Sequence, residues 1–253
     1  MPVASFSAVD LELWQYGLAL VAASCIGLSK TGFSGVSLVA VFILEGLFGA
    51  KASVGIALPL LILADLCVYP AFRKHGSWKP VWTLLLPTLV GIGIGLFLLD
   101  RVSDEVAGKG IGLAIGVMAL LQIIKMGKPE LMQKMADSKG FGIFAGGLGG
   151  IATMMANAAG PLIQIFLISR NFSKLDLLGI GARFFLLINL IKLPLSGGIG
   201  IVTWESLWLD LSLAPGILAG VLVGRKAIQY VPQRVFAWMI LSFALLASCR
   251  LLF

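Results

Sequence analysis

Apolar residues along this 253-residue chain gather into ten segments, separated by short polar or glycine-rich stretches. The segments cover roughly residues 13–29, 35–48, 53–72, 80–99, 107–125, 140–156, 161–169, 175–195, 206–224 and 234–252. A helix of ~20 apolar residues crosses the hydrocarbon core of a bilayer. The pattern therefore predicts an all-α, polytopic helical membrane protein with roughly 8–10 transmembrane or re-entrant helices.

Two short apolar runs, half a chain apart, each follow a glycine-rich break. The first break spans residues 27–35 and precedes the run 36–44, and the second spans 146–161 and precedes 162–168. Neither run has the length to cross a bilayer. Irregular backbone at membrane depth persists only where protein buries it or where it lines a wet cavity. A matched pair of breaks in two halves indicates the binding site of a transporter.

The composition agrees with a bilayer as the surroundings. Mean hydropathy is +1.02, and 59% of residues are hydrophobic against 12% charged, whereas soluble domains carry about 25% charged residues. The net charge of +7 comes from basic residues clustered in short loops. This clustering is typical of membrane orientation, so we expect lipid and no nucleic acid as a partner.

The basic residues also predict an orientation. Loops 73–79, 125–139, 170–174 and 225–234, which alternating segments place on one face, hold 12 of the 19 Lys and Arg residues, and the opposite face holds 3. Basic loops face the cytoplasm. We therefore expect a multi-pass protein of the cell (inner) membrane with both termini on the outer side. Residues 1–12 contain no Lys or Arg, so the first apolar segment is expected to be retained rather than cleaved as a signal peptide.

The two halves of the chain resemble each other weakly. The matched positions are Gly91 with Gly220, Gly95 with Gly224, and Gly35 with Gly160. Such a match predicts two inverted repeats of about five segments each, as in many secondary transporters. Residues 1–124 would form the first membrane repeat and 140–253 the second, joined by a cytoplasmic linker at 125–139. Gly91 and its neighbours also have the spacing of closely packed membrane helices.

Lys30 is the first candidate site residue, because it lies inside the first break with Thr31 and Ser34 beside it. Hydroxyls and free backbone N–H groups next to an ammonium form a cradle for a small anion. The alternative is a lysine that extends to the cytoplasmic interface at the end of its segment.

Arg183 is the second candidate, since it has apolar neighbours on both sides in segment 175–195. A guanidinium binds oxyanions through paired hydrogen bonds. The alternative is that Arg183 extends to the interface or pairs with Asp176.

Polar residues within other segments complete the candidate set. Asp65 is a candidate coupling residue that carries a proton, or else one half of an ion pair with Arg183, Lys192 or Lys30. Asn189 lies at the comparable place in the second half. Lys192 lies nearer the outer end of its segment, where extension to the interface is the simplest interpretation. Asn157 and Gln164 flank the second break, where amides either contact substrate or satisfy free backbone groups.

Other chemistries find little support. Cys25, Cys67 and Cys249 form no spaced pair, and the single histidine, His75, lies in a basic loop. We therefore expect no metal site, no cofactor and no enzyme activity.

Several of these features together resemble the sulfite exporter TauE/SafE family. They are the break from Gly27 to Gly35, the following run that ends at Ala50, the basic loop 73–79, and the second half that repeats the theme from Phe141 to Gly224. The resemblance implies transport of sulfite, thiosulfate, sulfonates or related small organic anions.

We interpret the chain as a secondary transporter that exports such an anion by alternating access. The predicted substrate-binding residues are Lys30, Thr31, Ser34, Asn157, Gln164, Arg183 and Asn189, with Asp65 as the coupling residue and protons as the candidate coupling ion. Two alternatives stay open: a membrane assembly or redox-accessory protein acting through Cys25 and Cys67, and a passive anion channel. An oligomer is compatible with the sequence.

Overall fold

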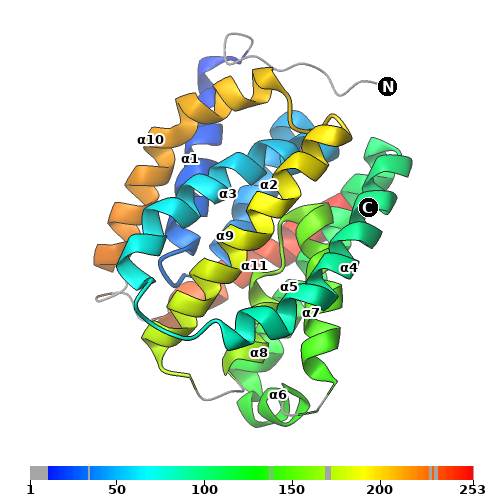
Figure 1. Cartoon of the computed structure of the whole chain (residues 1–253). Helices are drawn as coiled ribbons and strands as arrows, with labels where there is room; N and C mark the ends of the chain where they lie inside the picture. The colour runs from blue at the N-terminus through cyan, green and yellow to red at the C-terminus, as the bar shows by residue number, and fades with distance from the viewer. Residues whose placement is uncertain are drawn as a thin grey trace.

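The structure, a computed structural model, describes residues 11–33, 35–136, 138, 140–168, 172–227, 230 and 233–252. Within these ranges the chain forms eleven helices and no strand (Figure 1). The helices are α1 (Leu13–Ser29), α2 (Val36–Phe48), α3 (Ala50–Phe72), α4 (Lys79–Arg101), α5 (Asp104–Gly127), α6 (Pro129–Ala136), α7 (Phe141–Ala156), α8 (Gly160–Ile168), α9 (Lys174–Gly198), α10 (Trp204–Ala227) and α11 (Gln233–Leu252).

Five of the described helices, α3, α4, α5, α9 and α10, have the length and composition of membrane spans. Large apolar side chains on their outward faces are exposed, including Leu86 and Phe97 of α4 and Leu222 of α10. In water such a surface would drive association, whereas against lipid chains it carries no cost. The prediction of an all-α polytopic membrane protein is confirmed.

The short runs that follow the two breaks are helices too short to span a bilayer. α2 has 13 residues and α8 has 9, which correspond to about 20 Å and 14 Å of helix. Each packs back against the helix before its break, α2 on α1 and α8 on α7.

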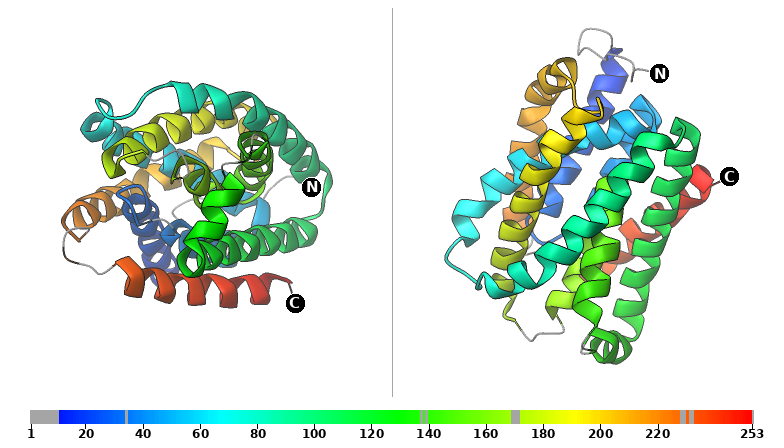
Figure 2. Two further views of the ribbon diagram at one scale, coloured as in Figure 1. Left: turned by 90° about the horizontal axis from the view of Figure 1, so that it is seen from below. Right: turned by 45° about the vertical axis from the view of Figure 1, so that its right-hand side comes forward.

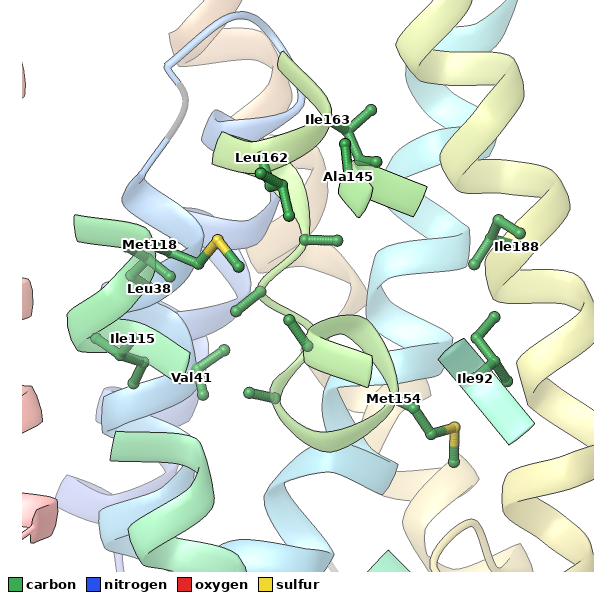
Figure 3. Close-up of a cluster of buried hydrophobic side chains, with 14 of the residues drawn as sticks. Leu38, Val41, Ile92, Ile115, Met118, Ala145, Met154, Leu162, Ile163 and Ile188 are labelled. Carbon is green, nitrogen blue, oxygen red and sulfur yellow. The ribbon is translucent and has the colours of Figure 1, made fainter. Parts of the chain in front are cut away.

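A buried apolar cluster holds α2 and α8 inside the molecule. Leu38 and Val41 of α2 are buried with Ile115 and Met118 of α5, and Leu162 of α8 belongs to the same cluster (Figure 3). The breaks thus lie within protein, the setting in which irregular backbone is tolerated at membrane depth.

The linker at 125–139 contains a helix that the apolar pattern did not predict. α6 is polar, so it produced no apolar segment. Pro129 stands at its first position, where a proline costs no hydrogen bond. Glu130 in the first turn and Lys134 in the last turn complement the helix dipole.

The remaining helices pair across the chain. α1 packs along α10, α4 along α7 and α5 along α11, while α3 contacts α9 (Figures 1 and 2). Glycines set the closest approaches. A Cβ atom on Gly91 of α4 would lie 2.1 Å from the carbonyl oxygen of Gly147, and one on Gly220 of α10 would lie 2.0 Å from that of Ser24. The prediction that Gly91 serves close helix packing is confirmed.

Candidate functional site

A small internal pocket lies between the two breaks and has a volume of about 60 Å³. Its lining comes from both halves of the chain: Ser29, Lys30, Gly35, Ser37, Leu61, Thr153, Asn157, Gly160, Gln164, Phe185 and Asn189. Four predicted substrate-binding residues are therefore brought together here, namely Lys30, Asn157, Gln164 and Asn189.

The first break is a tight reversal between α1 and α2. Gly32 and Gly35 have φ values of 113° and 101°, a left-handed region that glycine enters without steric cost. The hydroxyls of Ser29 and Thr31 donate to the carbonyls of Ile26 and Leu28 in the last turn of α1. The Thr31 hydroxyl is thus used within the break. Ser34, also predicted to bind substrate, lies outside the described residues.

The second break depends on Asn157. Its φ of 52° is left-handed, a conformation that asparagine tolerates better than most residues. Its Nδ2 donates to the carbonyl oxygen of Val54 in α3 at 3.0 Å. The side chain therefore ties the break in the second half to a helix of the first half.

Lys30 enters the pocket from the end of α1 and is paired with Asp65. Its Nζ lies 2.8 Å from Oδ1 of Asp65 and 4.8 Å from the centre of the Phe185 ring. The Nδ2 of Asn189 donates to Oδ2 of Asp65 at 2.9 Å. Of the three ion-pair partners considered for Asp65, the structure selects Lys30. One N–H group of the ammonium points at this carboxylate, and the side chain lines the pocket.

Lys192 of α9 is a second cation at the same site, and it is fully buried. Its Nζ donates to the carbonyl oxygen of Thr153 at 2.5 Å, to Oγ1 of Thr153 at 3.2 Å and to Oδ1 of Asn157 at 2.6 Å. Three acceptors match the three N–H groups of an ammonium. The interpretation of Lys192 as a side chain extending to the interface was wrong, because its partners lie on the second break.

Arg183 lies away from the pocket, at the loop that follows α3. Its guanidinium donates to the carbonyl oxygens of His75 at 2.6 Å and Gly76 at 3.2 Å, and to that of Arg73. The ring of Trp78 lies 5.6 Å away. The structure does not bring Arg183 together with the residues of the breaks, and its donors are used on carbonyls of the loop that follows α3.

The loop itself also binds Asp176, which was considered as a partner of Arg183. Oδ1 of Asp176 accepts from the backbone N–H of Gly76 at 2.6 Å. Arg183 and Asp176 thus hold the same loop from α9, one through its carbonyls and the other through an N–H group.

Replacing Arg183 by alanine is expected to destabilise the protein more than it changes anion affinity. Hydrogen bonds to a charged group contribute about 1.5–3 kcal/mol, so the apparent melting temperature should fall by about 3–12 °C. Arg183→Lys, which keeps the charge without the planar fork, should lie between alanine and the natural residue. An Arg183→Ala protein with unchanged melting temperature but no anion binding would instead indicate that Arg183 takes part in binding the anion.

Asp210 of α10 is a buried carboxylate that the sequence analysis did not single out. The residue is 5% exposed, and neither carboxylate oxygen has a hydrogen-bond partner among the described residues. Its helix packs against α1 and α3. Its position inside the apolar segment 206–224 could have identified it from the sequence as a buried charge. Asp210 does not line the pocket between the breaks.

The site combines two ammonium groups, one carboxylate and several amides in and around a small pocket. Ammonium and amide N–H groups are the donors that bind oxyanions. The residues that the structure describes include no group of three or more His, Cys, Asp or Glu placed to hold a metal. Cys25, Cys67 and Cys249 are free thiols, and none of them lines the pocket.

Comparison with protein families matches residues 18–251 to the family model described as sulfite exporter TauE/SafE. The match covers nearly the whole chain, including both breaks and the helices that carry Lys30, Asp65 and Lys192. No curated protein and no solved structure matches the chain.

Proposed function

Because the chain belongs to the sulfite exporter TauE/SafE family of membrane transporters, we propose that it exports a small sulfur-containing or organic anion by alternating access. Sulfite, thiosulfate and sulfonates are the candidate substrates. The observation that carries the proposal is the Lys30 ammonium, which lines a pocket built from both glycine-rich breaks.

The size of the pocket favours a small anion. A volume of about 60 Å³ corresponds to roughly four to six water-sized units at about 10–15 Å³ each. An oxyanion of four or five non-hydrogen atoms is of this size. Gln164 and Asn189 are amides that can donate to its oxygens, and Ser37 adds a hydroxyl.

Alternating access would use the two repeats at 1–124 and 140–253, joined by the linker at 125–139. The glycine contacts support this division. Gly91 of α4 lies against Gly147 of α7, and Gly220 of α10 lies against Ser24 of α1. Gly220 follows Gly91 by 129 residues and Gly147 follows Ser24 by 123 residues, so the two contacts join corresponding positions of the two halves. Helix α4 therefore corresponds to α10, and α7 corresponds to α1. Each of these helices packs on a helix of the other repeat, as a twofold relation between the repeats would produce. Rocking of one repeat against the other would open the pocket to each side in turn.

The orientation proposed from the basic loops gives export a driving force. We place the chain in the cell (inner) membrane with both termini on the outer side. An inside-negative potential favours the exit of a monovalent anion by ~2.3 kcal/mol per 100 mV. A uniporter is therefore sufficient for export, while uptake against this potential would need coupling to protons.

Electrical recording from the purified protein tests the proposal. Liposomes containing the full chain would be adsorbed on a solid-supported membrane and challenged with sulfite, thiosulfate, sulfoacetate, sulfate and lactate, with and without a pH gradient. We expect a saturable current with at least one sulfur oxyanion and stimulation of flux by anion on the opposite side.

Two other outcomes would contradict the proposal. Flux without stimulation from the opposite side would indicate a passive channel. Absence of both current and labelled-anion counterflow would favour an accessory protein, and in that case replacing Cys25, Cys67 and Cys249 by serine should impair its role. A transporter should keep its flux in the same cysteine-free variant.

A further inference from the structure

The charges around the pocket do not cancel, and the inference drawn from them rests on the proposed function. Lys30 lines the pocket and Lys192 binds two of its lining residues, Thr153 and Asn157. Asp65 is the carboxylate in contact with Lys30. With Lys192 as an ammonium group that donates to three acceptors, Lys30 as an ammonium and Asp65 as a carboxylate, the site carries a charge of +1.

Asp65 has the surroundings of an ionised carboxylate. Both of its oxygens accept, Oδ1 from the ammonium of Lys30 and Oδ2 from the amide of Asn189. Its side chain is 2% exposed, so water does not compete for these positions. An acceptor-only pair of oxygens is the hydrogen-bonding pattern of the charged form.

Other charged groups on the helices that pack against α3 lie elsewhere. Asp104 of α5 accepts from the backbone N–H groups of Ala50 and Lys51 at the opposite end of α3. Glu45 lies at this same end, close to Gly108 of α5. Asp210 of α10 has no hydrogen-bond partner among the described residues, and α7 carries no charged residue. On α9, Arg183 donates to the loop after α3, and Lys192 donates to Thr153 and Asn157. Lys30 is therefore the cation in contact with Asp65.

We propose that Asp65 matches the charge of the site to the valence of the anion. With Asp65 ionised, the site takes a monoanion; a dianion binds together with one proton, which Asp65 accepts from the solvent. The loaded site is neutral in both cases.

The physical reason is the cost of like charges in a buried site. An anion that reaches Lys30 lies close to Asp65, and repulsion between two charges at contact is several-fold stronger here than in water. A monoanion balances the +1 charge with Asp65 unchanged. A dianion leaves one uncompensated negative charge, which is costly when buried. Protonation of Asp65 removes it and also frees Lys30 to donate to the anion.

Proton counting during binding tests this inference. Thiosulfate serves as the dianion and methanesulfonate as a monoanion that does not titrate. Each is titrated calorimetrically into the purified full-length protein in two buffers of different ionisation enthalpy. We expect uptake of about one proton with thiosulfate and none with methanesulfonate. The dissociation constant for thiosulfate should rise about tenfold per pH unit once Asp65 is ionised in the free protein, because binding is linked to one proton.

Two variants locate the proton. Asp65→Asn mimics the protonated form, so it should bind thiosulfate without proton uptake and without the pH dependence. Asp210→Asn is the matched control at another buried aspartate, and it should keep the uptake of one proton.

Equal proton uptake for the two anions, or uptake that persists in Asp65→Asn, would overturn the inference while the proposed transport stands. Failure of both anions to bind would overturn the inference and the proposed function together. The measurement on the natural chain decides the point even where Asp65→Asn does not fold.

Discussion

Anion flux is expected to fall by at least about a hundredfold when Lys30 is replaced by alanine. Lys30 is the cation that lines the described pocket, and its loss leaves Asp65 buried without its ion pair. In the loaded site the anion also loses its ammonium partner, and removing one partner of a buried charge pair costs about 3–5 kcal/mol, which corresponds to two or more orders of magnitude in an equilibrium constant. Solid-supported membrane currents and direct binding of thiosulfate would both report the loss.

Two further variants separate loss of binding from loss of folding. The double variant Lys30→Ala/Asp65→Asn removes the unpaired charge, so it should recover the melting temperature without recovering flux. Lys109→Ala is the matched surface control, since Lys109 is exposed and pairs with Glu105 one turn away. It should transport normally. Substantial flux in a folded Lys30→Ala protein would contradict a role for Lys30 in the anion site.

Alanine at Gly91 or Gly220 is expected to destabilise the protein strongly, although it adds one methyl group. The added carbon would lie 2.1 Å from a backbone oxygen at Gly91 and 2.0 Å from one at Gly220. Backbone atoms cannot rotate away, so the helix pairs must separate. Overpacking of this kind costs about 1–3 kcal/mol, and the two variants combined should prevent stable folding. Fluorescence-detected size-exclusion chromatography after heating would measure the change.

Gly93 provides the control within the same helix. A Cβ there meets nothing within 4 Å, so Gly93→Ala should be neutral or slightly stabilising, because alanine favours helix. Because Gly91 and Gly220 make corresponding contacts, their single variants should lose similar amounts of stability. A tolerated Gly91→Ala alongside a disruptive Gly93→Ala would show that α4 does not pack on α7 as described.

The helices and the place of the pocket could be predicted from the sequence because both depend on local pattern. Apolar length identified the spans, and the glycine-rich stretches 27–35 and 146–161 contain the two places where helices are interrupted. The interruptions are shorter than those stretches, because residues 146–156 belong to α7. Lys30 could be placed at the pocket because it lies within a break. In each case the signal and the structure belong to the same short stretch of chain.

The roles of Arg183 and Lys192 could not be predicted, because they depend on contacts between distant parts of the chain. Both are cations in one apolar segment, and depth along a segment does not say which way a side chain points. Arg183 meets carbonyls more than 100 residues earlier in the sequence. Lys192 meets Thr153 and Asn157, 39 and 35 residues earlier. The way α9 packs against its neighbours places Arg183 at the loop after α3 and Lys192 at the second break.

The pairing of α1 with α10 has a consequence for how the chain is made. Helix α1 finds its closely packed partner α10 only after about 190 further residues have been synthesised, whereas α4 meets α7 much sooner. During translation α1 must therefore remain in the bilayer with Gly27 and Ser24 facing lipid or the insertion machinery rather than α10. The first half of the nascent protein is therefore an incomplete assembly until α10 has been made.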